Sequence, residues 1–142
     1  MTELSEHEMV LAEEELVALV QSLRAIRNEV RWKPGKDNSH LAKRQRMKHL
    51  SVSSSLADYE QIIYDTVRNG QNIVYSYEFS GTYYYAVRGF VSDHEWLVLF
   101  GQGGVMETAF PPENMDEYLE RRGFTLLGSV EEVLQWTKEV NT

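Results

Sequence analysis

The first thirty residues carry apolar side chains with the spacing of an amphipathic helix. They recur every three or four residues and so share one helix face: Met9, Ala12, Leu16, Leu19, Leu23, Ile26 and Val30. Ser5 and Glu8 form a capping box, the usual start of such a helix, and Pro34-Gly35 breaks the pattern. We predict a long helix within residues 1–31, from about Glu6 to residue 30 or 31, that buries Leu16, Leu19, Leu23 and Ile26.

The pattern lapses over residues 33–55 and then returns. KPGKDNSH is rich in turn residues, and LAKRQRMKHL allows a short basic helix. A second amphipathic helix follows, marked by Leu56, Tyr59, Ile62, Ile63 and Val67. Asn69-Gly70 ends this helix in the usual C-terminal way.

Residues 72–110 change to the period of two that is typical of strands. Apolar and polar positions alternate through IVYSYEF, TYYYAVRGF, HEWLVLF and VMETAF. Ser80-Gly81 and Ser92-Asp93 supply tight turns, and GQGG at 101–104 precedes a strand, which indicates a turn rather than a phosphate loop. The sequence therefore predicts an α+β fold, with N-terminal helices packed on a four-stranded antiparallel meander over 72–110.

The tail over 113–142 is predicted to be mainly helical. Asn114 caps a short helix through Arg122, and Ser129 with Glu132 forms a capping box for the last helix. FTLLG at 124–128 would add a fifth strand at the sheet edge. We predict one domain over residues 1–142, because this length is normal for a single domain.

Composition excludes several classes of protein. The chain has no cysteine, which excludes disulfides, thiolate zinc sites and a cysteine nucleophile. It has no apolar run long enough to span a membrane, and its acidic N-terminus is unlike a signal peptide. No metal-binding or nucleotide-binding motif occurs. We expect a cytoplasmic protein of bacterial or phage origin, with no membrane partner, no cofactor and no metal.

The net charge of −8 is distributed unevenly. Residues 1–20 carry six Glu and no Lys or Arg, whereas residues 21–50 carry nine Lys or Arg against Glu29 and Asp37. The basic stretch either neutralises the acidic helix beside it or binds an anion. The helix itself either packs on its own domain or pairs two copies in a homodimer.

The basic stretch also holds the candidate chemistry of the chain: His40, Lys43, Arg44, Arg46, Lys48 and His49. Metal-free RNA cleavage needs a base to take the proton of the ribose 2′-OH and a cation to stabilise the phosphorane. It also needs an acid to protonate the departing oxygen. Histidine suits both proton transfers because its ordinary pKa lies near 6.5.

The order of these elements suggests a family. A basic segment ending in Lys48-His49 precedes the helix ADYEQIIYDTVRNG, and the meander that follows closes in METAFPP. Over residues 40–112 this resembles the barnase–EndoU–colicin–RelE superfamily of metal-independent ribonuclease toxins. The resemblance implies an endoribonuclease or RNA-binding domain with a site on one face of the sheet.

Carried over by the resemblance, the catalytic positions are Lys48, His49, Arg88 and Thr108, with Tyr84 on the same strand face as Arg88 as a substrate-binding position. Lys43 and Arg46 of the basic cluster are the other candidates for substrate binding. Ordinary structural roles also fit these residues. Arg88 suits a cross-strand pair with Glu78 or Glu95, and the tyrosines suit the core as well as base stacking. The nuclease hypothesis requires that His49, Arg88 and Thr108 meet on a sheet face not covered by the N-terminal helix.

A second hypothesis comes from a different class of function. The chain would then be a non-catalytic interaction module, immunity-like or regulatory, whose acidic helix or tail binds a basic protein. Both hypotheses fit the same α+β architecture. They differ in whether RNA binds and whether the named residues form one site.

Overall fold

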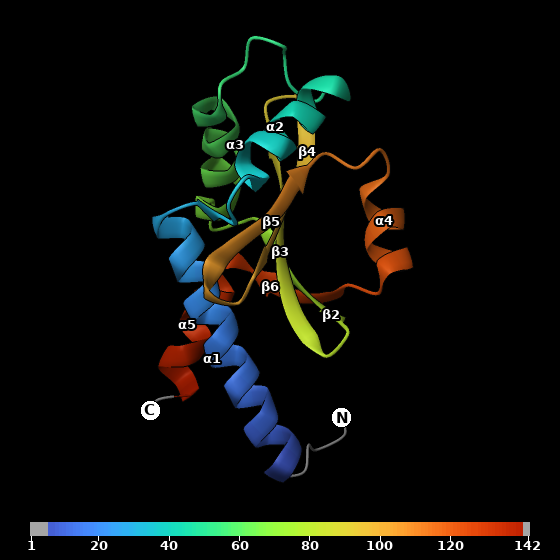
Figure 1. The fold of residues 1–142 in the computed structure, drawn as a ribbon. Coiled ribbons are helices and arrows are strands. Elements are labelled where there is room, and N and C mark those ends of the chain that lie inside the picture. The colour runs from blue at the N-terminus through green and yellow to red at the C-terminus, as the bar shows by residue number, and fades with distance from the viewer. Residues whose placement is uncertain (1–5, 141–142) are drawn as a thin grey trace.

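Figure 1 shows the fold as a computed structural model, which describes residues 6–140, with side chains described for 13–136. Within this range there are five helices and six strands. In chain order the elements are α1 (Glu6–Asn28), β1 (Arg31–Trp32), α2 (Lys36–Arg46), α3 (Leu56–Arg68), β2 (Ile73–Phe79), β3 (Thr82–Val91), β4 (His94–Gly101), the 3-10 turn η1 (Gln102–Gly104), β5 (Val105–Phe110), α4 (Met115–Arg122), β6 (Thr125–Ser129) and α5 (Val130–Val140).

The strands form one six-stranded sheet in the order β1-β5-β4-β3-β2-β6. The predicted meander is confirmed, because β2 to β5 pair as antiparallel neighbours. The predicted edge strand is also confirmed, as β6 pairs antiparallel with β2. A purely antiparallel sheet of four or five strands was wrong, because β1 adds a sixth strand parallel to β5, with Arg31 opposite Val105.

This extra strand exists because α1 ends earlier than its apolar spacing predicts. The last helical residue is Asn28. The Val30 N–H donates to the hydroxyl of Tyr64 on α3, at 2.9 Å, instead of continuing the helix. The next two residues are then free to extend and pair with β5. The predicted Ser5–Glu8 capping box, Met9 and Ala12 lie outside the residues whose side chains are described.

Helices cover the two faces of the sheet unequally (Figure 1). α1, α3 and α5 share one hydrophobic core with the inward residues of the strands, such as Val87 and Val98. The predicted burial of Leu19, Leu23 and Ile26 is confirmed, whereas Leu16 is only partly buried. The opposite face carries α4, which packs Met115 and Leu119 on Ala86 and Leu97 in a second, smaller core. None of the helices described is long and apolar enough to cross a membrane.

The glycine-rich segment before β5 is a turn seated on α1. The Gly103 N–H donates to Ser22 Oγ at 3.0 Å. Gly104 has a φ of +80°, and a Cβ at this position would lie 2.8 Å from the backbone nitrogen of Ile26. The absence of a side chain is therefore what lets η1 approach the helix so closely.

Candidate functional site

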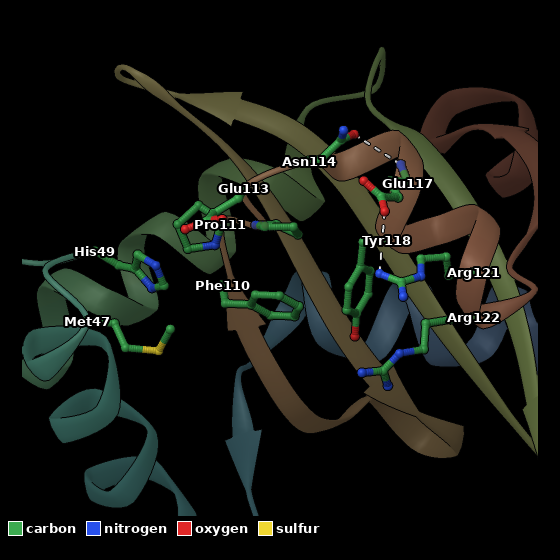
Figure 2. A pocket seen from close by; sticks show the side chains of 11 residues that line it. Met47, His49, Phe110, Pro111, Glu113, Asn114, Glu117, Tyr118, Arg121 and Arg122 are labelled. Atoms are coloured by element: carbon green, nitrogen blue, oxygen red, sulfur yellow. Dashed lines mark hydrogen bonds and ion pairs between the residues drawn. The ribbon is translucent and has the colours of Figure 1, made fainter.

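A cleft opens on the α4 side of the sheet, at the end of β5. It lies between the segment after α2 and α4, and we call it the α2–α4 cleft. Figure 2 shows Met47 and His49 on one side, Phe110 in the middle, and Tyr118, Arg121 and Arg122 on the other side. Pro111, Pro112, Glu113, Asn114 and Glu117 complete its lining. Its volume of about 680 Å³ lies in the range of small-molecule and nucleotide sites.

Aromatic rings meet in the middle of the cleft, and two arginines of α4 lie on one side of them. The rings of Phe110 and Tyr118 pack edge to face, with centroids 5.2 Å apart. The guanidinium of Arg122 lies over Tyr118, 4.9 Å from the ring centroid. Arg121, one residue earlier, forms an exposed ion pair with Glu117 at 3.4 Å. Stacking surface and cationic donors therefore lie side by side on α4.

A tight turn after α2 places His49 at the other side of the cleft. Lys48 adopts a left-handed conformation with a φ of 61°. The His49 N–H then donates to the Arg44 carbonyl at 2.9 Å, and the Lys48 N–H donates to the Gln45 carbonyl at 3.1 Å. These two bonds are the Schellman pattern that ends many helices, usually with glycine at the left-handed position. The turn folds His49 back against the Arg44 side chain.

Arg44 lies beneath the cleft and joins His49 to Phe110. Its Nη1 donates to His49 Nδ1 at 3.2 Å, and its guanidinium lies 5.5 Å from the centroid of the Phe110 ring. Burial, followed by the positive charge of Arg44, lowers the pKa of His49 below its ordinary 6.5. His49 is therefore neutral at pH 7.

A second histidine, His40, contacts the sheet from α2, one helical turn before Arg44. His40 Nδ1 lies 3.3 Å from Thr108 Oγ1, and the imidazole stacks on Trp32. Thr108 and Phe110 face the same side of β5, since alternate residues of a strand share a face. His40 and Arg44, four residues apart on α2, therefore contact Thr108 and Phe110 respectively. Burial and then the charge of Arg44 lower the pKa of His40.

Arg88 lies on the same sheet face but is occupied by other partners. Leu97 pairs with both Arg88 and Phe110, which places all three in one row. The Arg88 Nε donates to Glu95 at 2.7 Å, and its Nη1 donates to Asp116 on α4 at 2.8 Å. These carboxylates raise the pKa of Arg88, with Glu95 the largest cause. The cross-strand role with Glu95 is confirmed, and its contact with Asp116 ties α4 to the sheet.

The predicted site residues are brought together only in part. His49 lines the cleft, but its contact is Arg44, whereas Thr108 contacts His40 and Arg88 contacts Glu95. Lys43, Arg46 and Lys48 are exposed on or just after α2, and Tyr84 is half-buried on β3. α1 lies on the opposite face and does not cover this one. Within the basic stretch, Lys33 forms an ion pair with Glu107 on β5 at 3.0 Å.

Several cleft residues escaped the sequence reasoning: Phe110, Glu113, Tyr118, Arg121 and Arg122. Arg121 and Arg122 at the end of the predicted short helix, close to Tyr118, could have suggested a binding site. The local sequence does not show that they lie near His49. No family model, curated protein or solved structure matches the chain. Among the described side chains of residues 13–136, no group of three or more His, Asp or Glu is placed to hold a metal ion.

Proposed function

We propose that the protein binds single-stranded RNA across the α2–α4 cleft. The observation that carries this proposal is the pair of aromatic rings at the centre of the cleft, with Arg121 and Arg122 of α4 beside them. Phe110 and Tyr118 offer a stacking surface for a base, and stacking of one base on a protein ring contributes roughly 1–3 kcal/mol. Arg121 and Arg122 would contact the flanking phosphates.

The charge distribution favours a short contact with a single strand. The chain carries a net charge of −8, which opposes RNA over most of the surface. The exposed cations Lys43, Arg46 and Lys48 lie on or just after α2, outside the lining of the cleft. Few phosphates are then contacted, so the salt dependence of binding should be shallow. Each phosphate contact contributes about −0.7 to the slope of log K against log salt for a single strand.

Arg122→Gln should weaken the binding of a fluorescein-labelled oligouridine about tenfold at low salt, equivalent to about 1.4 kcal/mol. The substitution removes one charge that would contact phosphate but keeps a polar side chain of similar length. Fluorescence anisotropy measures the affinity, and repeating it across a salt series should give a slope shallower by about 0.7.

The chain offers a matched control for this variant. Arg68 lies over Tyr64 at the end of α3, as Arg122 lies over Tyr118, but on the opposite side of the sheet. Arg68→Gln should therefore leave RNA affinity unchanged. Equal losses in both variants would mean that the arginines act through general charge or stability. No binding by the wild-type protein would reject the proposal and favour the interaction module.

RNA cleavage is a second candidate function, favoured by the contact between His40 and Thr108. His40 is the histidine that the structure places beside a strand hydroxyl, and its pKa is lowered by burial and by Arg44, Lys43 and Lys36. A neutral imidazole at pH 7 can accept the proton of a ribose 2′-OH. The neighbouring Lys43 would stabilise the phosphorane. His49 is the histidine that the sequence predicted for this chemistry, and the same assay tests both residues.

Metal-free cleavage predicts a 2′,3′-cyclic phosphate product in the presence of EDTA. His40→Ala should slow it on the order of 10²–10⁴-fold if His40 is the base, whereas His49→Ala should act mainly through binding. Denaturing gels of an end-labelled RNA measure the rate, and a substrate with a 2′-deoxy residue at the cut site should resist cleavage. Cleavage that survives His40→Ala would exclude His40 as the base.

A further inference from the structure

Arg44 is a buried charge without a counter-charge. Its residue is 3% exposed, and its Nε has no hydrogen-bond partner. Among the ion pairs of the described residues, none involves Arg44. A guanidinium keeps its proton even when burial lowers its pKa. An unpaired buried charge is costly. The fold nevertheless keeps Arg44 charged, and its positive field lies directly beneath the cleft.

The contact between Arg44 and His49 fixes the position of the histidine proton. Arginine has only donors, so His49 Nδ1 must accept this hydrogen bond with its lone pair. In the neutral ring the proton is then on Nε2, on the side away from Arg44. Because Nε2 already carries a proton and Nδ1 is occupied, His49 offers a donor to the cleft and no free site for a proton.

We propose that the cleft holds a phosphate subsite in which Arg44 is the positioning residue and His49 donates Nε2–H to a phosphate oxygen. This rests on the proposed RNA-binding function and assigns the ligand group that His49 contacts. The unpaired charge of Arg44 attracts the anion without touching it, and Arg122 approaches from the other side. The arrangement resembles the use of a neutral histidine as a donor in other sites, where a nearby positive field disfavours imidazolium.

Three groups set the charge state of His49. Arg44 from α2 and His94 from the start of β4 lower its pKa, in addition to burial, and Glu113 after β5 raises it. Because the folded pKa lies below its ordinary 6.5, the neutral form of His49 predominates above that pH and is nearly complete one pH unit higher. The contribution of His49 to RNA affinity should therefore stay constant between about pH 7.5 and 8.5. A charged histidine would instead lose affinity as the pH rose.

Nitrogen-15 NMR of the histidine side chains tests the inference directly on the wild-type protein. At about pH 7.5 the shifts should show His49 with a protonated Nε2 and an unprotonated Nδ1. Arg44→Met should release this tautomer, raise the pKa of His49 and weaken oligouridine binding about tenfold. Arg46→Met removes the same charge from an exposed position of α2 and should leave the tautomer and pKa unchanged.

Each outcome decides a separate point. A proton on Nδ1 in the wild type, or an unchanged His49 pKa in folded Arg44→Met, would overturn the role of Arg44. Titration with inorganic phosphate separates the subsite from the RNA function. If phosphate shifts the His49 resonances but oligouridine does not bind, the subsite stands and the RNA function fails. If neither phosphate nor oligouridine shifts these resonances, the subsite is rejected.

Discussion

Leu19→Asp is expected to destabilise the fold severely. The leucine is 2% exposed in the core shared by α1, α3, α5 and the sheet. Removing it forfeits roughly 1.5–3 kcal/mol of burial, and a carboxylate there has no partner and must be desolvated or protonated. The combined loss exceeds about 4 kcal/mol, a large part of the 5–15 kcal/mol that stabilises a typical domain. Circular dichroism during urea unfolding measures the effect.

Gln21→Asp provides the matched control, because Gln21 is exposed on the same helix. An aspartate at this exposed position changes the helix propensity and the surface charge, but its carboxylate stays in solvent. It should shift the unfolding free energy by about 0.5 kcal/mol or less. Similar unfolding curves for the two variants would show that the predicted stripe of α1 is not a packing face.

Gly104→Ala should destabilise the protein by about 2–5 kcal/mol, although it adds a single methyl group. Part of this is the left-handed backbone, which costs an L-residue roughly 1–2 kcal/mol. The rest is overpacking, since the new Cβ would lie 2.8 Å from both Ala25 Cβ and the Ile26 nitrogen. A helix backbone cannot move aside as a flexible side chain can.

The adjacent glycine separates the two contributions to this loss. Gly103 has a similar φ of +77°, but a Cβ at this position would have no neighbouring atom within 4 Å. Gly103→Ala should therefore cost only the backbone part, about 1–2 kcal/mol. Urea midpoints of both variants measure the difference. Equal losses would mean that the approach of η1 to α1 contributes nothing.

Much of the fold could be predicted because local patterns decide it. The alternation from Ile73 to Phe110 identified the meander, and the capping residues at Asn114 and Ser129 marked the last two helices. Even the partner of Arg88 was among the predicted alternatives. β1 could not be predicted, since two residues carry no period and their strand forms by pairing with residues more than seventy positions later.

The site was harder to predict because its two halves meet only through tertiary structure. His49 reaches Arg44 through a turn in which a lysine takes the place usually held by glycine, and composition does not reveal this turn. Arg122 reaches the cleft because β5 and the segment after it deliver α4 to that sheet face. His40 and Arg44 lie four residues apart on α2, but neither their shared helix face nor their partners on β5 were predicted.

The position of α5 has a consequence for folding during synthesis. Val130 and Val133 complete the same core as Leu23 on α1, and Arg24 donates to the carbonyl of Leu134, 110 residues further along the chain. A ribosome adds roughly 5–20 residues per second, so roughly 5–20 seconds pass between the synthesis of α1 and that of α5. During that interval the apolar stripe of α1 is incompletely covered. We therefore expect the nascent chain to be prone to aggregation until α5 emerges.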